Sequence, residues 1–184
     1  MTLLAGYATT GLNDVTSLSV STNIGFYAPV AAVTAGIATS IKFYYITGGS
    51  VANFQFTIIK GAGSDNAGGG SAVAHTASTA VSGLTANNWN TISLLTNPNI
   101  LTDGSLYTIA VQADASAYLS VTSGIGYNIY TTGGSYGTTP TTLASGGGHI
   151  YTGATSVYVD GTVGPTYYPQ SRRRRIFLPA FYPG

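Results

Sequence analysis

Hydrophobic and polar residues alternate in residues 53–59, where every second side chain is large and apolar. A period of two is typical of a β-strand that turns one face toward a core. We therefore predict a strand there whose core face carries Phe54, Phe56 and Ile58. The opposite face is expected to carry the polar side chains Asn53, Gln55 and Thr57.

Four other stretches are short, apolar and rich in β-branched or aromatic residues. They predict strands over residues 41–47, 89–94, 106–112 and 156–160. In two of them the alternation also predicts the inward side chains, which are Ile92, Leu94, Tyr107, Ile109 and Val111.

Helix formers are scarce in this chain. It has no glutamate, only two lysines and 25 glycines, and Ser and Thr recur throughout. Turn residues separate the predicted strands at roughly the 8–12-residue spacing that is typical of sandwiches and barrels. We predict an all-β fold, a single antiparallel β-sandwich.

The pattern divides the chain into three parts. Residues 1–23 are the least patterned and are predicted to form an extended N-terminal arm that orders on a neighbour. Residues 24–164 carry the strand pattern and are assigned to the sandwich. Residues 165–184 hold four prolines, which exclude a central strand or a helix, and they are predicted to form an Arg- and Pro-rich C-terminal tail.

Composition changes the picture of the surface. Apolar residues make up 44% of the chain and charged residues only 6%, against about 25% in an average domain. Charge normally keeps a protein soluble and monomeric, so this balance favours a protein packed into an assembly or exposed outside the cell. There is no cysteine, which excludes disulfides and thiolate metal sites. No segment reaches the ~18 apolar residues of a membrane span, and we expect no membrane partner.

The order of strands and turns resembles a known group of domains. Residues 39–44 (TSIKFY), 56–61 (FTIIKG), 89–94 (WNTISL), 101–112 (LTDGSLYTIAVQ) and 133–140 (GGSYGTTP) carry this resemblance. They are similar to jelly-roll β-sandwich domains of phage virion surface proteins and of extracellular carbohydrate-binding or adhesion modules. The resemblance implies a jelly roll and a binding or structural function, and it brings no active-site motif.

Candidate catalytic groups are isolated. The five aspartates stand mostly in turn-like contexts, and His75 and His149 are far apart in the sequence. Acid–base catalysis needs a positioned pair or a histidine held by a second group, so we expect a protein without enzymatic activity. The Gly-rich stretches lack the lysine and the strand–loop–helix setting of a phosphate loop. Gly63–Asn66 is too poor in acidic residues for a calcium loop, and we expect no metal and no cofactor.

Aromatic residues are the stronger signal, because the chain holds 14 tyrosines and one tryptophan. Tyrosine combines apolar area with a hydroxyl, which suits both protein interfaces and sugar faces. One interpretation is that most of these rings fill the sandwich or a subunit contact. The other is a glycan-binding surface, for which the candidates are Trp89, Tyr127, Tyr130, Tyr136 and Tyr151.

The tail carries the main concentration of charge. Two lysines and five aspartates make the rest of the chain weakly acidic, and the tail then adds four consecutive arginines. The tail is predicted to dock on a partner, to stay solvated, or to bind nucleic acid; the last is disfavoured because four arginines are few beside an acidic body. Arginine mixed with aromatic residues favours docking. The docking candidates are Arg172, Arg173, Arg174, Arg175, Phe177, Phe181 and Tyr182.

Two functions follow as expectations. In the first, the chain is a structural protein of a bacteriophage or similar virion: a capsid decoration, fibre or tail-associated protein. Its partners would be other virion proteins and copies of itself, with a homotrimer favoured. In the second, it is an extracellular carbohydrate-binding or adhesion module that contacts host or environmental glycans.

Overall fold

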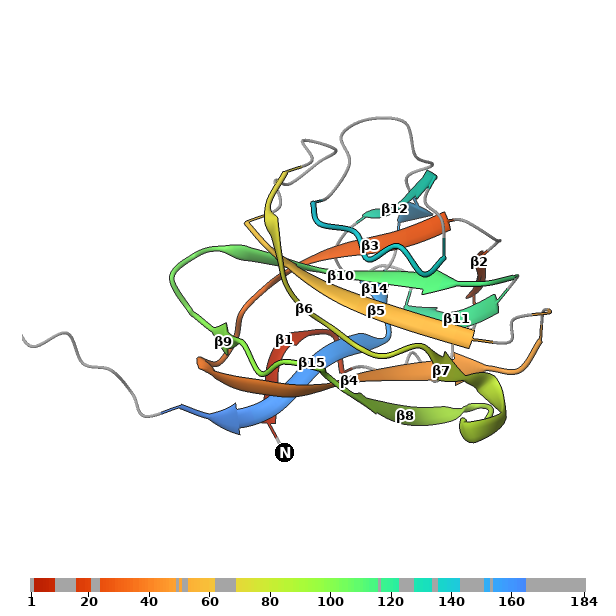
Figure 1. Cartoon of the computed structure of the whole chain (residues 1–184), viewed down its shortest axis with the longest axis horizontal. Helices are drawn as coiled ribbons and strands as arrows, with labels where there is room; N and C mark the ends of the chain where they lie inside the picture. The colour runs from red at the N-terminus through yellow and green to blue at the C-terminus, as the bar shows by residue number, and fades with distance from the viewer. Residues whose placement is uncertain are drawn as a thin grey trace, which may run out of the picture.

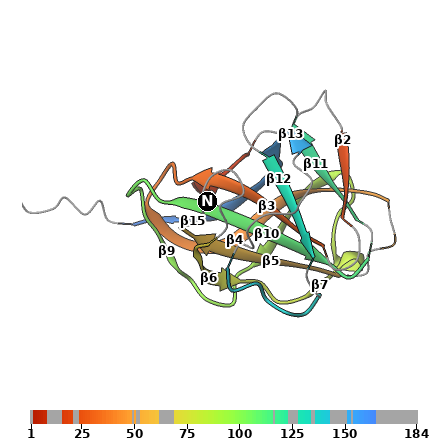
Figure 2. The ribbon, with the colours of Figure 1, turned by 90° about the horizontal axis from the view of Figure 1, so that it is seen from above.

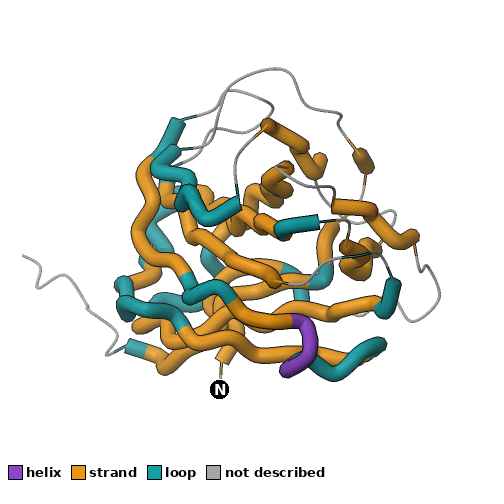
Figure 3. Tube along the Cα trace, turned by 45° about the vertical axis from the view of Figure 1, so that its right-hand side comes forward, coloured by secondary structure: helices purple, strands orange, loops and turns teal. Residues whose placement is uncertain are grey.

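Two antiparallel sheets form the described part of the chain, which has a β-sandwich-like fold (Figure 1). The computed structural model describes residues 2–8, 16–20, 24–48, 50, 53–61, 69–115, 117–122, 128–133, 136–142, 151–152 and 154–164. Almost all of the regular structure in these residues is strand, and the one helical element among them is the short 3-10 turn η1 (Val81–Gly83) (Figure 3).

The first sheet contains eight strands, which are β1 (Thr2–Gly6), β2 (Thr16–Val20), β4 (Gly36–Ile46), β8 (Asn88–Ser93), β9 (Asn99–Ile100), β11 (Ala117–Thr122), β14 (Ala154–Thr155) and β15 (Val157–Val163). Strand β4 is its centre. It pairs with β15 and β11 on one edge and with β8 and β9 on the other.

The second sheet contains seven strands, which are β3 (Ile24–Ala31), β5 (Asn53–Lys60), β6 (Ser71–His75), β7 (Thr79–Ala80), β10 (Leu106–Ala113), β12 (Asn128–Gly133) and β13 (Tyr151–Thr152). Its order is β13-β12-β3-β10-β5-β6, with β7 also on β5. Figure 2 shows β12, β3, β10 and β5 side by side in this sheet.

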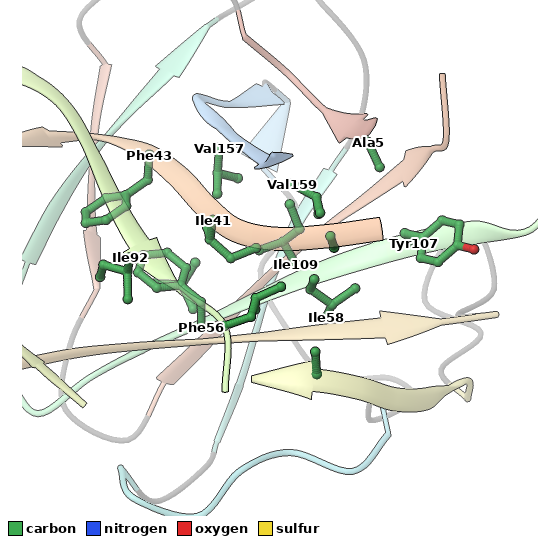
Figure 4. Packing of buried hydrophobic residues seen from close by; sticks show 14 of the residues in the cluster. Ala5, Ile41, Phe43, Phe56, Ile58, Ile92, Tyr107, Ile109, Val157 and Val159 are labelled. Atoms are coloured by element: carbon green, nitrogen blue, oxygen red, sulfur yellow. The ribbon is translucent and has the colours of Figure 1, made fainter. Parts of the chain in front are cut away.

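The core lies between the two sheets (Figure 4). Phe43 of β4 faces Phe54 and Phe56 of β5, with ring centroids 5.7 and 4.6 Å away. Ile41 and Tyr107 join this cluster from β4 and β10 and are fully buried. The inward side chains predicted from the alternation, including Ile58, Ile92, Leu94, Ile109 and Val111, are all buried, which confirms the strand faces.

The outer face of the second sheet is also covered. Gln55 and Thr57 lie on the polar face predicted for β5, yet both are buried. Residues 136–142 pass over this face: the amide of Gln55 donates to the hydroxyl of Thr139, and that of Gln112 to the backbone oxygen of Thr138. The alternation predicted the face correctly, but it could not show that a distant segment packs on it.

The prediction of an N-terminal arm over residues 1–23 is wrong for the residues described there. Strand β1 pairs with β15, and its Leu4 and Ala5 are fully buried in the core. Strand β2 pairs with β11. Strand β1 was missed because it is short and Leu3-Leu4-Ala5 does not alternate with polar residues.

Replacing Leu4 with alanine should therefore destabilise the protein by about 2–5 kcal/mol, because it removes a buried leucine from the core. The free energy of unfolding in urea measures this. Leu95→Ala is the matched control: this leucine is 60% exposed, and its loss should change stability by less than about 0.5 kcal/mol. Equal effects of the two changes would show that β1 does not belong to the sandwich.

Candidate functional site

Three aromatic side chains meet on the outer face of the first sheet: Tyr44, Trp89 and Tyr158, here called the aromatic cluster. Tyr44 stands between the buried Phe43 and Tyr45, so the period of two directs it away from the core. Tyr158 likewise stands between two buried valines of β15. The register places Trp89 of β8 directly opposite Tyr44.

The rings pack edge to face. The centroid of Trp89 is 5.9 Å from that of Tyr44, at an interplanar angle of 87°, and 5.3 Å from that of Tyr158, at 63°. In such tilted pairs the positive edge of one ring meets the negative face of the other. This attraction adds to the stabilisation that comes from burying apolar area. All three side chains remain half-buried, so the cluster is ordered but accessible.

A turn before β8 holds the cluster in place. Asn87 has a φ of +53°, a backbone conformation in which asparagine is favoured over most other residues. Its backbone oxygen accepts a 2.6 Å hydrogen bond from the hydroxyl of Tyr44, and its side-chain oxygen accepts one from the backbone N–H of Thr47. The turn thereby ties the start of β8 to the end of β4.

Polar groups border the cluster on one side. The ammonium of Lys42 lies 5.9 Å from the ring centroid of Tyr158, within the range of a cation–π contact. It also lies 3.5 Å from the carboxylate of Asp160, whose side chain is only 2% exposed. An apolar ring beside a charged hydrogen-bond donor can contact both the apolar and the polar groups of a ring-shaped ligand such as a sugar.

The cluster is not a flat platform. Because Trp89 stands nearly perpendicular to Tyr44, a ligand can stack on one ring at a time. The arrangement therefore suits a single sugar unit or a protein side chain, rather than an extended chain lying across several coplanar rings.

The predicted glycan-binding residues that the structure describes do not form one group, although Tyr130 and Tyr151 lie on strands that pair with each other. Trp89 lies in the first sheet, whereas Tyr130 and Tyr151 lie on β12 and β13 of the second. Tyr136 is hydrogen-bonded through its hydroxyl to that of Ser78, beside β7. Tyr127 lies outside the described residues, as do the predicted docking residues Arg172, Arg173, Arg174, Arg175, Phe177, Phe181 and Tyr182.

Tyr44, Tyr158, Lys42 and Asp160 were missed as site residues. The sequence did contain a signal, because alternation within residues 41–47 and 156–160 directs Lys42, Tyr44 and Tyr158 outward. What it lacked was the pairing of β8 and β15 with β4, which brings these side chains to Trp89.

Charged side chains are few on the described surface, and most of them are paired. Asp114 accepts two hydrogen bonds from Asn53, and Asp160 is buried beside Lys42. Lys60 and Asp103 form an exposed pair with a nitrogen–oxygen distance of 3.0 Å.

Hydrogen bonds from Ser105, followed by that from Lys60, lower the pKa of Asp103 from 3.8 to about 2. The hydrogen bond to Asp103 in turn raises the pKa of Lys60. Both groups therefore keep their charges at neutral pH, and the pair adds no net charge to the surface.

Within the described residues, no three His, Asp or Glu side chains group in a way that could hold a metal ion. The same residues include no helix that is long and apolar enough to span a membrane.

No family model, curated protein or solved structure matches this chain. The resemblance to phage and carbohydrate-binding jelly rolls therefore stays a prediction.

The ion pair between Lys42 and Asp160 can be tested by removing its positive charge. Lys42→Met should destabilise the fold by about 3 kcal/mol, because it leaves the buried carboxylate of Asp160 without its charged partner. Lys60→Met is the matched control and should have a much smaller effect, since Asp103 is 44% exposed and water replaces the lost contact. Chemical denaturation at pH 7 measures both, and a larger loss in the control would contradict this account.

Proposed function

We propose that this protein is a non-enzymatic structural component of a bacteriophage or similar virus particle: a capsid decoration, fibre or tail-associated protein. Its sandwich faces outward, its C-terminal tail anchors it to other virion proteins or to sister subunits, and it assembles as a homo-oligomer, with a trimer favoured. It is made in the host cell and leaves with the particle.

The charge-poor surface of the sandwich carries this proposal. The described residues include only five aspartate and lysine side chains: Lys42, Lys60, Asp103, Asp114 and Asp160. One of them is buried, and each contacts a partner. Free monomeric proteins ordinarily rely on net charge to resist association, so a surface of this kind favours permanent packing against neighbours.

The jelly-roll topology implied by the resemblance belongs to the same proposal. Its support is the antiparallel pairing of the described strands and the crossing of the chain between sheets. Strands β3, β4 and β5 lie in the second, first and second sheet in turn, and β10, β11 and β12 repeat this alternation.

Deleting residues 171–184 should abolish incorporation into particles, because the deletion removes the four arginines and the apolar anchors beside them. Particles assembled in host cells with the full-length or truncated chain, then purified and immunoblotted, measure this. A variant with the four arginines changed to lysine is the control for charge alone. Incorporation of the truncated chain at the full-length level would contradict anchoring by the tail.

Glycan binding is the second candidate function, and the aromatic cluster is the observation that favours it. Trp89, Tyr44 and Tyr158 offer a half-buried ring surface beside the ammonium of Lys42. The two functions are compatible, because a virion surface protein can also contact host or environmental glycans.

Trp89 is the only tryptophan, so its fluorescence reports on this cluster alone. If the cluster binds sugars, a glycan bound on a glycan array should shift Trp89 emission, and Tyr158→Ala should weaken binding at least tenfold. Tyr136→Ala, a change beside β7 in the other sheet, should leave binding unchanged. Binding that survives loss of Trp89 and Tyr158 would exclude the cluster as the glycan site.

A further inference from the structure

Large apolar side chains are exposed mainly at one end of the sandwich. Among the described residues, five such side chains are at least 40% exposed. Four of them belong to segments that meet where β4 begins and β15 ends, and we call them the end patch: Val33, Ile37, Leu101 and Val163. The fifth, Leu95, follows β8, and its backbone N–H donates to the oxygen of His75 at the end of β6.

Strand pairing places Ile37, Leu101 and Val163 at the same end of the first sheet, and the backbone N–H of Val33, three residues before β4, donates to the oxygen of Leu4 in β1. The period of two sets Val163, opposite the inward Gly36, on the core side of the sheet and Ile37 on its outer side, so the patch spans the rim of the sandwich. Val163 lies opposite Gly36, and Ile37 lies opposite both Thr162 and Asn99. Leu101 directly follows Ile100, which is also opposite Gly36. Figure 1 shows β9 and the end of β15 at this same end of the molecule. The exposed side chains of the end patch are therefore carried by ordered segments.

Close backbone packing keeps this end well defined. A side chain at Gly161 would meet the backbone oxygen of Ile37 at 2.1 Å, and one at Gly36 would meet that of Thr162 at 2.2 Å. Only glycine permits β4 and β15 to approach so closely. The backbone N–H of Gly164 then donates to the oxygen of Ala35, which brings the chain to the edge of the patch before residue 165.

The C-terminal tail thus begins at the end patch, and its chemistry complements the patch. Its last nine residues include five apolar or aromatic anchors, Ile176, Phe177, Leu178, Phe181 and Tyr182. Pro179 and Pro183 limit ladder pairing within this segment, so side-chain packing would be its main means of binding.

We propose that the end patch is the docking site for residues 176–182 of a second copy of this chain. Four aliphatic side chains are too few for a stable interface by themselves, because a standard one buries about 800 Å² on each partner. Exchanged tails would supply the missing area. In a closed ring of copies, each copy donates one tail and receives one, so every end patch is covered by a tail.

The sequence between the patch and the anchors favours binding of the tail to the patch of a neighbouring copy, rather than to the patch of its own chain. Residues 165–175 span at most about 36–40 Å when extended. Pro165 and Pro169 favour extended backbone, and repulsion among the four arginines opposes a reversal of the chain. The partner of the tail is thus a second copy of the chain. This rests on the proposed function, in which copies of the protein assemble.

The chain has no cysteine, so a disulfide can test the contact directly. Two variants of the whole chain are mixed: one carries Leu101→Cys, and the other carries Phe181→Cys and a tag that makes it larger on a gel. Subunits are allowed to exchange before oxidation. We expect a disulfide between the two different chains, seen on a non-reducing gel. The matched control replaces Leu101→Cys with Leu95→Cys. Leu95 is more exposed than Leu101 but lies outside the patch, so the control should give little of this product.

A second measurement does not depend on crosslinking. Val163→Asp places a charge in the patch and should lower the mass of the oligomer in light scattering, whereas Leu95→Asp should leave it unchanged. A monomeric wild-type protein would overturn the proposal. So would equal crosslinking in the Leu95 control, or a Leu101→Cys/Phe181→Cys chain that crosslinks only within itself.

These results are separable from those on the proposed function. If no disulfide forms between chains but the truncated chain still fails to enter particles, the docking site is wrong and the anchoring function stands. If the disulfide forms but the protein is absent from purified particles, the virion function is wrong and the contact between copies stands.

Discussion

The structure depends on strand β4 being paired along both of its edges. With no cysteine in the chain, stability has to come from burial and from ladder hydrogen bonds. β4 joins β15 and β11 to β8 and β9, and its inward Phe43 packs on Phe54 and Phe56 of the other sheet. The same strand therefore organises the first sheet and connects it to the second.

This pairing also creates both surfaces to which we assign binding. Outward side chains of β4, β8 and β15 form the aromatic cluster, since the register sets Tyr44 opposite Trp89 and Tyr158 opposite Lys42. Where β4 begins, its contacts with β9 and β15 leave aliphatic side chains exposed around Gly36. One strand thus links a half-buried, partly polar site on a face to an apolar site at an end.

The two surfaces differ in the chemistry that they offer. The cluster combines tilted rings with the ammonium of Lys42, which suits a small polar ligand. The end patch has only apolar side chains and lies where the tail starts, which suits packing against another protein surface. Under our proposals, the cluster contacts a ligand and the end patch contacts another copy of the chain.

By itself, the sequence determined the all-β class, five of the strands and the faces of β5, β8 and β10, because the period of two is a local property that side-chain polarity reveals. It also indicated Trp89, and its alternation left Tyr44 and Tyr158 outward. The tertiary structure alone decided that these rings meet, that β1 belongs to the sandwich, and that residues 136–142 cover Gln55. Each of these depends on which distant segments pair or pack, and such contacts leave no periodic trace in either segment.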